Sequence, residues 1–209
     1  MEQITDESKS RRPGVAAVNV IAVGAVGGLL VGMLTAPMQG WLPESVRSLS
    51  NSAGPWSVVA FFLALRASTT LVGATTASIT LACCEIGYVI SSTIRGDANS
   101  RATTIFWLVA ACAAGPLLGI AATWASQQHL VRRGACYGVL FGVLFGEGLY
   151  GLNRLSETTD SRFWAAEVAI AAVGLAIVIL RNRSLAMTGS LMAMTTAAAS
   201  VVFLAAVSV

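Results

Sequence analysis

Seven apolar stretches, separated by short polar segments, run through this chain. They cover residues 15–38, 54–65, 70–94, 102–125, 134–152, 163–180 and 184–207. A helix that crosses the hydrocarbon core of a bilayer takes about 20 residues, and every stretch except the second reaches roughly that length. The second stretch reaches only about 18 Å of the roughly 30 Å core. The pattern predicts an all-α membrane protein in which the segment at 54–65 is the exception.

The distribution of Lys and Arg decides whether the short stretch crosses, because cytoplasmic loops carry an excess of these residues. If the short stretch crosses and the N-terminus is cytoplasmic, most of the bases lie inside; without that crossing the two sides are nearly equal. We therefore predict seven transmembrane helices, with the N-terminus in the cytoplasm and the C-terminus outside. The inside bases are Lys9, Arg11, Arg12, Arg66, Arg132, Arg133, Arg181 and Arg183, and the outside bases are Arg47, Arg95, Arg101, Arg154 and Arg162.

The chain divides into a short tail and one membrane domain. Residues 1–14 are polar, mixed in charge and end in a Pro-Gly pair, which predicts a disordered cytoplasmic tail. Residues 15–209 form a single polytopic transmembrane domain. The first apolar stretch is longer than the roughly 7 to 15 residue core of a cleaved signal peptide, so we expect it to remain in the mature protein.

Composition agrees with the membrane class and limits the chemistry. Hydrophobic residues make up 56% of the chain and charged residues 11%, against about 25% charged in soluble domains. The cysteines lie inside apolar stretches without zinc spacing, which indicates buried packing residues and no metal or disulfide framework. The arginines are scattered, so we expect no nucleic-acid partner. We also expect no cofactor. The cysteines are Cys83, Cys84, Cys112 and Cys136.

Glycine recurs at every fourth position in two of the apolar stretches. In lipid, small residues four apart let helix backbones approach closely, so these glycine-zipper patterns predict helix packing surfaces. The stretch at 102–125 repeats the spacing with Ala111, Gly115 and Gly119, and we expect the three ladders to form a tightly packed centre. The glycines predicted to pack are Gly24, Gly28, Gly32, Gly134, Gly138, Gly142 and Gly146.

The two glycine ladders also indicate an internal repeat. The second and sixth stretches both begin near a tryptophan, Trp56 or Trp164, and end at an arginine, Arg66 or Arg181. The first three and last three helices then form parallel repeats joined by the fourth, a 3+1+3 arrangement. The alternative is that the periodicity reflects only the common use of glycine in membrane helices.

Three acids, Glu85, Glu147 and Glu167, lie within apolar stretches, where an ionisable group is costly enough to be a functional candidate by default. Glu85 shares a polar helix face with residues that include Tyr88 and Ser92, and such a face must meet protein or a watery cavity. A structural hydrogen bond to a neighbouring helix is an equal alternative for Glu85.

The other two acids have competing interpretations near the membrane surface. Glu147 precedes Arg154 by two helical turns, so a local ion pair competes with a binding role. Glu167 lies four residues into its stretch, near Arg162 and Trp164, which favours a side chain that reaches the outer interface.

The segment "NSAGPW" before the short stretch combines a turn signal, a proline and an interfacial tryptophan. With the shortness of the helix, it suggests non-helical backbone at membrane depth beside a cavity, although a plain helix cap explains it equally. The predicted substrate-binding residues are Glu85, Tyr88, Ser92, Glu147, Asn51 and Trp56.

The strings "LSNSAGPW", "GYVISSTIRG", "AAGPLLG" and "GVLFGEGLYG" resemble an uncharacterised family of actinobacterial multi-pass integral membrane proteins, classed as a domain of unknown function. The resemblance covers most of the chain from the first to the fifth predicted helix and weakens toward the C-terminus. It implies membrane localisation and carries no known activity or site.

Three classes of function remain after exclusions. Lys9 is the only lysine and His129 the only histidine, which excludes a retinal Schiff base, bis-histidine haem and a histidine-dependent protease. We favour a carrier or substrate-capturing protein for a small cationic or polar solute, with proton exchange. The alternatives are a non-catalytic subunit or assembly factor of a larger membrane complex, or an enzyme on a lipid-borne substrate. The expected partners are the bilayer, the solute or a proton, and a second copy or another membrane protein.

Overall fold

The computed structural model describes residues 13–125, 127–182 and 184–207, and this part of the chain is helical without strands. The predicted disordered tail lies almost wholly outside these residues. The long helices are α1 (Pro13–Trp41), α4 (Thr70–Arg95), α5 (Arg101–Trp124), α6 (Leu130–Tyr150), α7 (Ser161–Arg181) and α8 (Leu185–Val207). The shorter elements are α2 (Glu44–Arg47), the 3-10 turn η1 (Ser48–Asn51), α3 (Ala53–Ala64) and the π-helical turn η2 (Gly151–Leu155).

Five of the described helices, α1, α4, α5, α6 and α7, are long and apolar enough to cross a membrane. The 12 residues of α3 form a shorter apolar helix, as its sequence length requires. An all-helical protein with several helices of membrane length is therefore confirmed.

The ends of the long helices follow from local sequence. Thr69 and Ser100 begin α4 and α5, and their side-chain oxygens accept the amides of Val72 at 3.2 Å and Thr103 at 3.4 Å. Asp160 accepts the amide of Arg162 at 2.8 Å at the start of α7. These are ordinary N-caps, in which a side chain satisfies an amide that has no partner within the helix. Gly96 ends α4 in the left-handed conformation, with φ 78°.

Each glycine ladder lies against the backbone of another helix. A Cβ at Gly28 or Gly32 of α1 would overlap backbone atoms of Thr80 or Cys84 in α4. Along α6, Cβ atoms at Gly138 and Gly142 would lie 2.6 and 2.7 Å from carbonyl oxygens of α8. The remaining ladder positions follow the same pairing: Gly24 meets Thr76 of α4, and Gly134 and Gly146 meet Met187 and Ala199 of α8.

The ladders do not pack on one another, so the expectation of one centre built from all three is wrong. The ladder of α1 meets α4 and that of α6 meets α8, while Gly115 and Gly119 of α5 lie against Ser78 and Gly73 on α4. The glycine spacing marks a surface that permits close approach but carries no information on which helix approaches.

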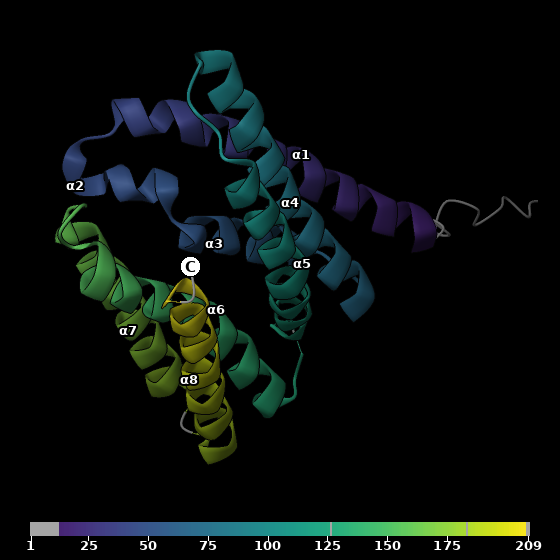
Figure 1. Cartoon of the computed structure of the whole chain (residues 1–209). Coiled ribbons are helices and arrows are strands. Elements are labelled where there is room, and N and C mark those ends of the chain that lie inside the picture. The colour runs from purple at the N-terminus through teal and green to yellow at the C-terminus, as the bar shows by residue number, and fades with distance from the viewer. Residues whose placement is uncertain (1–12, 126, 183, 208–209) are drawn as a thin grey trace, which may run out of the picture.

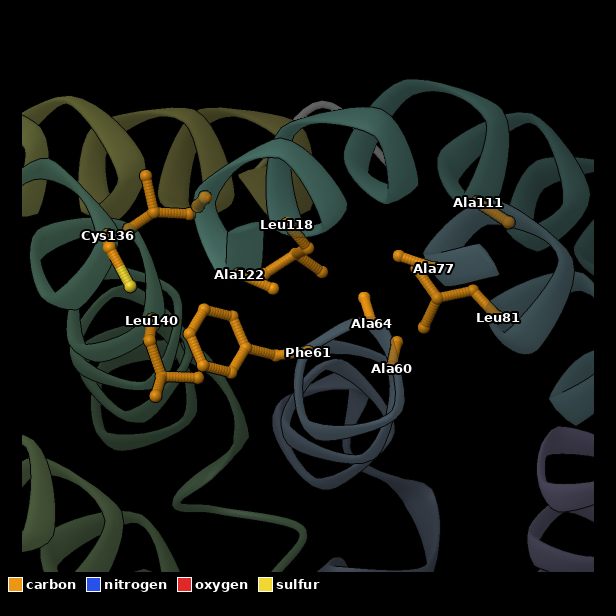
Figure 2. Close-up of a cluster of buried hydrophobic side chains, with 12 residues drawn as sticks. Ala60, Phe61, Ala64, Ala77, Leu81, Ala111, Leu118, Ala122, Cys136 and Leu140 are labelled. Carbon is orange, nitrogen blue, oxygen red and sulfur yellow. The ribbon is translucent and has the colours of Figure 1, made fainter. Parts of the chain in front are cut away.

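The short helix α3 joins the two halves of the molecule. Figure 1 shows α3 between α1, α4 and α5 on one side and the later group from α6 to α8 on the other. Phe61 reaches from α3 toward Cys136 and Leu140 of α6, while Ala60 and Ala64 lie near α4 (Figure 2). Protein therefore buries one side of α3, whereas Phe62 on the other side is 57% exposed. Ser52 and Gly54 at its irregular start are buried, and burial in protein is the condition under which irregular backbone is tolerated at membrane depth.

Candidate functional site

The site begins at an interruption before α3. Ser52 is extended, with φ −111° and ψ 136°, and it separates the 3-10 turn η1 from α3. Pro55 lies in the first turn of α3, where its missing amide breaks no helical bond. Unlike the caps of α4, α5 and α7, Ser52 makes no side-chain cap hydrogen bond. The first amides of α3 therefore need another partner.

Glu147 of α6 supplies that partner from a distant part of the chain. Its Oε1 accepts the amide of Ala53 at 2.7 Å, and its Oε2 accepts the amide of Gly54. The positive end of a helix stabilises a negative charge, and hydrogen bonds to a charged group are stronger than neutral ones. A partly buried carboxylate from α6 thus caps α3.

Glu167 of α7 lies against the same glycine. Its side chain is 5% exposed, and a Cβ on Gly54 would overlap its Oε1 and lie 2.6 Å from Oε2 of Glu147. The other oxygen of Glu167 is buried without a hydrogen-bond partner in the described part of the chain. Residue 54 must be glycine for both carboxyl groups to fit. We call Glu147, Glu167 and Gly54 the carboxyl pair site.

Two sequence interpretations of these acids are wrong. Glu167 does not reach an interface, because it is buried between helices. Glu147 makes no ion pair with Arg154, which is exposed; the ion pair that the described residues contain joins Arg95 and Asp97 at 3.2 Å. In both cases the preferred partner is the start of α3, which is remote in sequence.

Glu85 lines a separate pocket of about 200 Å³ on the other side of Ser52 and Ala53. Its side chain is 3% exposed. Three aromatic residues, Trp56, Tyr88 and Trp107, share the wall, and no basic residue is among the described residues that line it. The full lining, which we call the Glu85 pocket, is Thr35, Ser50, Ser52, Ala53, Trp56, Glu85, Tyr88, Ala98, Asn99, Ser100, Thr103, Thr104 and Trp107.

Hydrogen bonds hold the wall of the Glu85 pocket in place. Trp56 Nε1 donates to Thr35 Oγ1 at 3.3 Å, and Thr35 in turn donates to the carbonyl of Val31 at 2.9 Å. The rings of Trp56 and Tyr88 lie 6.5 Å apart between centroids and are tilted by 58°, within the range of favourable aromatic pairs. These contacts fix the positions of Thr35, Trp56 and Tyr88 in the wall.

A smaller apolar pocket of about 60 Å³ adjoins the Glu85 pocket. The two share Ala53, Trp56 and Trp107. The remaining lining of the smaller pocket is mostly alanine, together with Ser57 and Leu81. The Glu85 pocket thus has a carboxyl group and hydroxyls in its lining, whereas the smaller pocket is lined mostly by methyl groups.

The structure places the six predicted binding residues in different surroundings. Glu85, Tyr88 and Trp56 line one pocket, whereas Glu147 belongs to the carboxyl pair site. Ser92 is buried outside the lining, and its hydroxyl donates to the carbonyl of Tyr88 at 2.8 Å. Asn51 is the last residue of η1, and the structure describes its backbone but not its side chain.

Sequence reasoning missed Thr35, Thr104 and Trp107. Near the start of α5, Trp107 follows Thr103 by four residues and Thr104 by three, so it lies on the same helix face as both. This polar and aromatic face was the available signal. Thr35 comes from α1, and nothing in its own apolar surroundings distinguishes it.

The described part of the chain contains no group of three or more His, Cys, Asp or Glu residues placed to hold a metal ion. The cysteines are free thiols. What the arrangement offers chemically is carboxylates, hydroxyls and aromatic faces.

The helices and the pocket define a class: an all-helical protein with the helix lengths and apolarity of a multi-pass membrane protein, and with a partly open pocket among its helices that has polar and aromatic lining residues. Residues 11–209 match DUF6518, a family of unknown function, and the chain belongs to that family. The resemblance to an uncharacterised family is thereby confirmed. No curated protein and no solved structure matches the chain.

Proposed function

We propose that this protein captures or carries a small cationic solute, which binds in the Glu85 pocket. The observation that carries the proposal is a buried carboxylate that shares a pocket with three aromatic side chains and, among the described lining residues, with no basic group. A buried charge is costly unless it is paired. A cationic solute would supply the missing partner.

The aromatic wall favours the same class of solute. Cations are attracted to the faces of Trp and Tyr rings, and quaternary ammonium groups are typically bound in aromatic cages. Trp56, Tyr88 and Trp107 provide three such rings around Glu85. The volume of about 200 Å³ is below the roughly 300 to 1,000 Å³ of pockets for drug-sized ligands, so the solute is a small amine or ammonium ion.

The position of the pocket supports the topology that the sequence predicts. Its lining comes from the last part of α1, the start of α3, the second half of α4 and the start of α5. With seven crossings and a cytoplasmic N-terminus, all of these ends lie on the outer side, and the pocket opens outward.

Two single-cysteine variants test this topology in a background without the native cysteines. Gln128→Cys lies in the loop after α5 and Glu157→Cys in the loop after η2, and both residues are exposed. We expect an impermeant thiol reagent applied from outside to label position 157 and not position 128. Labelling of both positions from the same side would contradict the topology.

A repeat of three helices on either side of α5 is part of the proposal. In the first half the glycine ladder of α1 packs on α4, and in the second half the ladder of α6 packs on α8. In both halves the first helix therefore meets the third. The middle helices differ, because α3 has 12 residues and α7 has 21. The Glu85 pocket lies beside the shorter middle helix, α3, whose residues Ala53 and Trp56 line it.

Binding of ammonium probes to the purified protein tests the function. Trp56 and Trp107 line the pocket, so tetramethylammonium and methylammonium should change tryptophan fluorescence, and a neutral probe of similar shape, tert-butanol, should not. Glu85→Gln should reduce affinity by about tenfold or more, which corresponds to about 1.4 kcal/mol. Glu157→Gln, an exposed acid, is the matched control and should bind normally.

Two results would contradict the carrier proposal. If ammonium, methylammonium, guanidinium and tetramethylammonium all fail to bind, or if Glu85→Gln binds them as well as the wild type does, the carrier proposal is wrong. Co-purification of a stoichiometric membrane-protein partner would then favour the alternative, a non-catalytic subunit of a larger complex.

A further inference from the structure

We propose that Glu147 and Glu167 bind one exchangeable proton between them, at the N-terminus of α3. The two carboxyl groups meet at Gly54: Oε2 of Glu147 accepts the Gly54 amide, and Oε1 of Glu167 lies against the same residue. The second oxygen of Glu167 is buried and has no partner among the described residues. An unpartnered oxygen on a carboxyl group that is 5% exposed indicates a missing ligand, and a proton is the smallest ligand that fits.

No cation in the described residues compensates a second negative charge at this site. α3 contains no charged residue. The basic side chains on the elements packed against α7, and on the first turn of α7, are exposed or lie at the far end of their helices. Glu44, Arg47, Arg154 and Arg162 are exposed, and Tyr150 is half-buried. Arg132, Arg133 and Arg181 lie 14 or 15 residues from the pair, roughly 21 Å along a helix.

The two acids have different surroundings, which assigns the proton to one of them. Glu147 receives two backbone amides at the positive end of a helix, and both features stabilise its charged form. Glu167 receives no hydrogen bond at its Oε2. The proton therefore resides on Glu167, and the pair carries one negative charge. Release of the proton leaves two adjacent carboxylates with a charge of minus two.

The carboxyl pair site is connected to the Glu85 pocket through two residues. Glu147 binds the amide of Ala53, and Ala53 and its neighbour Ser52 line the pocket. Repulsion between two carboxylates would draw Glu147 away from the start of α3 and move the pocket wall. This link rests on the proposed function, whereas the proton site itself does not.

Infrared spectroscopy tests the proton site directly, because a protonated carboxyl group has a C=O stretching band that a carboxylate lacks. The experiment uses the Glu85→Gln background, which removes the other buried acid, and compares it with the same protein carrying Glu167→Gln. We expect one carboxylic acid band near neutral pH that shifts in deuterium oxide and is lost with Glu167→Gln. Glu167→Asp should restore the band, and Glu157→Gln should leave it unchanged.

A second measurement needs no substitution at the carboxyl pair site itself. In the Glu85→Gln protein, raising the pH should remove the band as the site releases its proton, and lowering the pH should restore it. The proposal is overturned if the band is absent at all pH values at which the protein remains folded, or if Glu167→Gln leaves it intact.

The link to the pocket has its own readout. We expect the affinity for tetramethylammonium to depend on pH in the wild type and to lose that component in Glu167→Gln. A band that is present together with binding that is independent of pH would overturn the link and support the proton site. A band without any ammonium binding would support the proton site and contradict the proposed function.

Discussion

The Glu85 pocket and the carboxyl pair site lie on two sides of the same short segment, Ser52 to Gly54, and use their acids in different ways. Glu85 faces a cavity with hydroxyls and aromatic rings. Glu147 and Glu167 line neither of the two pockets and meet backbone directly. All three acids lie in helices of membrane length, so helix position alone does not decide the role of such an acid. What decides it is whether the carboxyl group meets open space or a helix end.

The start of α3 belongs to both the carboxyl pair site and the Glu85 pocket. Glu147 holds it from one side, and it forms part of the pocket wall on the other. Changes at the carboxyl pair site should therefore alter stability most, while changes in the Glu85 pocket should alter binding and leave stability nearly unchanged.

The largest loss of stability is expected for Glu147→Ala. Loss of the carboxylate leaves the amides of Ala53 and Gly54 without their partner, and each unsatisfied buried group costs about 1 to 3 kcal/mol. We expect a loss of about 2 to 6 kcal/mol in the free energy of unfolding, measured by reversible denaturation in lipid nanodiscs. Glu157→Ala, at an exposed acid, should change stability by less than about 0.5 kcal/mol. Equal stability of the two variants would show that Glu147 does not cap α3.

The second largest loss of stability is expected for Gly54→Ala. The added Cβ would overlap Oε1 of Glu167 and lie 2.6 Å from Oε2 of Glu147 and 3.0 Å from Leu144. Overpacking of this kind costs about 1 to 3 kcal/mol. Gly14→Ala is the matched control, because a Cβ there meets nothing within 4 Å. A wild-type melting temperature for Gly54→Ala would contradict the close contact of the two carboxyl groups.

A smaller effect on stability is expected for Glu85→Gln, although its effect on binding is large. The amide keeps the size of the side chain and loses the charge that faces the pocket. We expect unfolding to change by less than about 1 kcal/mol, within the range of single substitutions that break no packing, as measured in the same denaturation experiment. A loss as large as that of Glu147→Ala would mean that Glu85 is structural and that the two regions do not differ.

The smallest effect is expected for Ser92→Ala. The hydroxyl bonds to the carbonyl of Tyr88 in its own helix, and Ser92 does not line the pocket. We expect tetramethylammonium affinity to stay within about twofold of the wild type, a difference of about 0.4 kcal/mol. A loss of affinity as large as that of Glu85→Gln would place Ser92 in the site after all.

Much of the fold could be predicted from local sequence because helix length and apolarity are local properties. The apolar stretches matched helices, the shortness of 54–65 matched α3, and membership in an uncharacterised family was confirmed. The spacing of the glycines identified surfaces of close contact, but the partners α4 and α8 depend on how whole helices dock. A glycine ladder identifies one side of a helix–helix interface, and the local sequence does not identify the helix on the other side.

The site could be predicted only where a single stretch of sequence reveals an energetically costly residue. A glutamate in an apolar stretch is conspicuous, which is why Glu85 and Glu147 were found. The cap that Glu147 provides joins residues 94 positions apart, and no local pattern encodes that contact. Glu167 was misread for the same reason: its neighbours in sequence indicated an interface, while its neighbours in space are Gly54 and Glu147.

The most direct test of the central claim is to locate a bound cation. Crystals grown with tetramethylarsonium, whose arsenic atom scatters anomalously, would show where the ion binds in an anomalous difference map. We expect a single peak in the Glu85 pocket, beside the Glu85 carboxylate and among the rings of Trp56, Tyr88 and Trp107, and we expect it to be absent in Glu85→Gln. A peak elsewhere, or an empty pocket at a concentration that saturates binding in solution, would contradict the account.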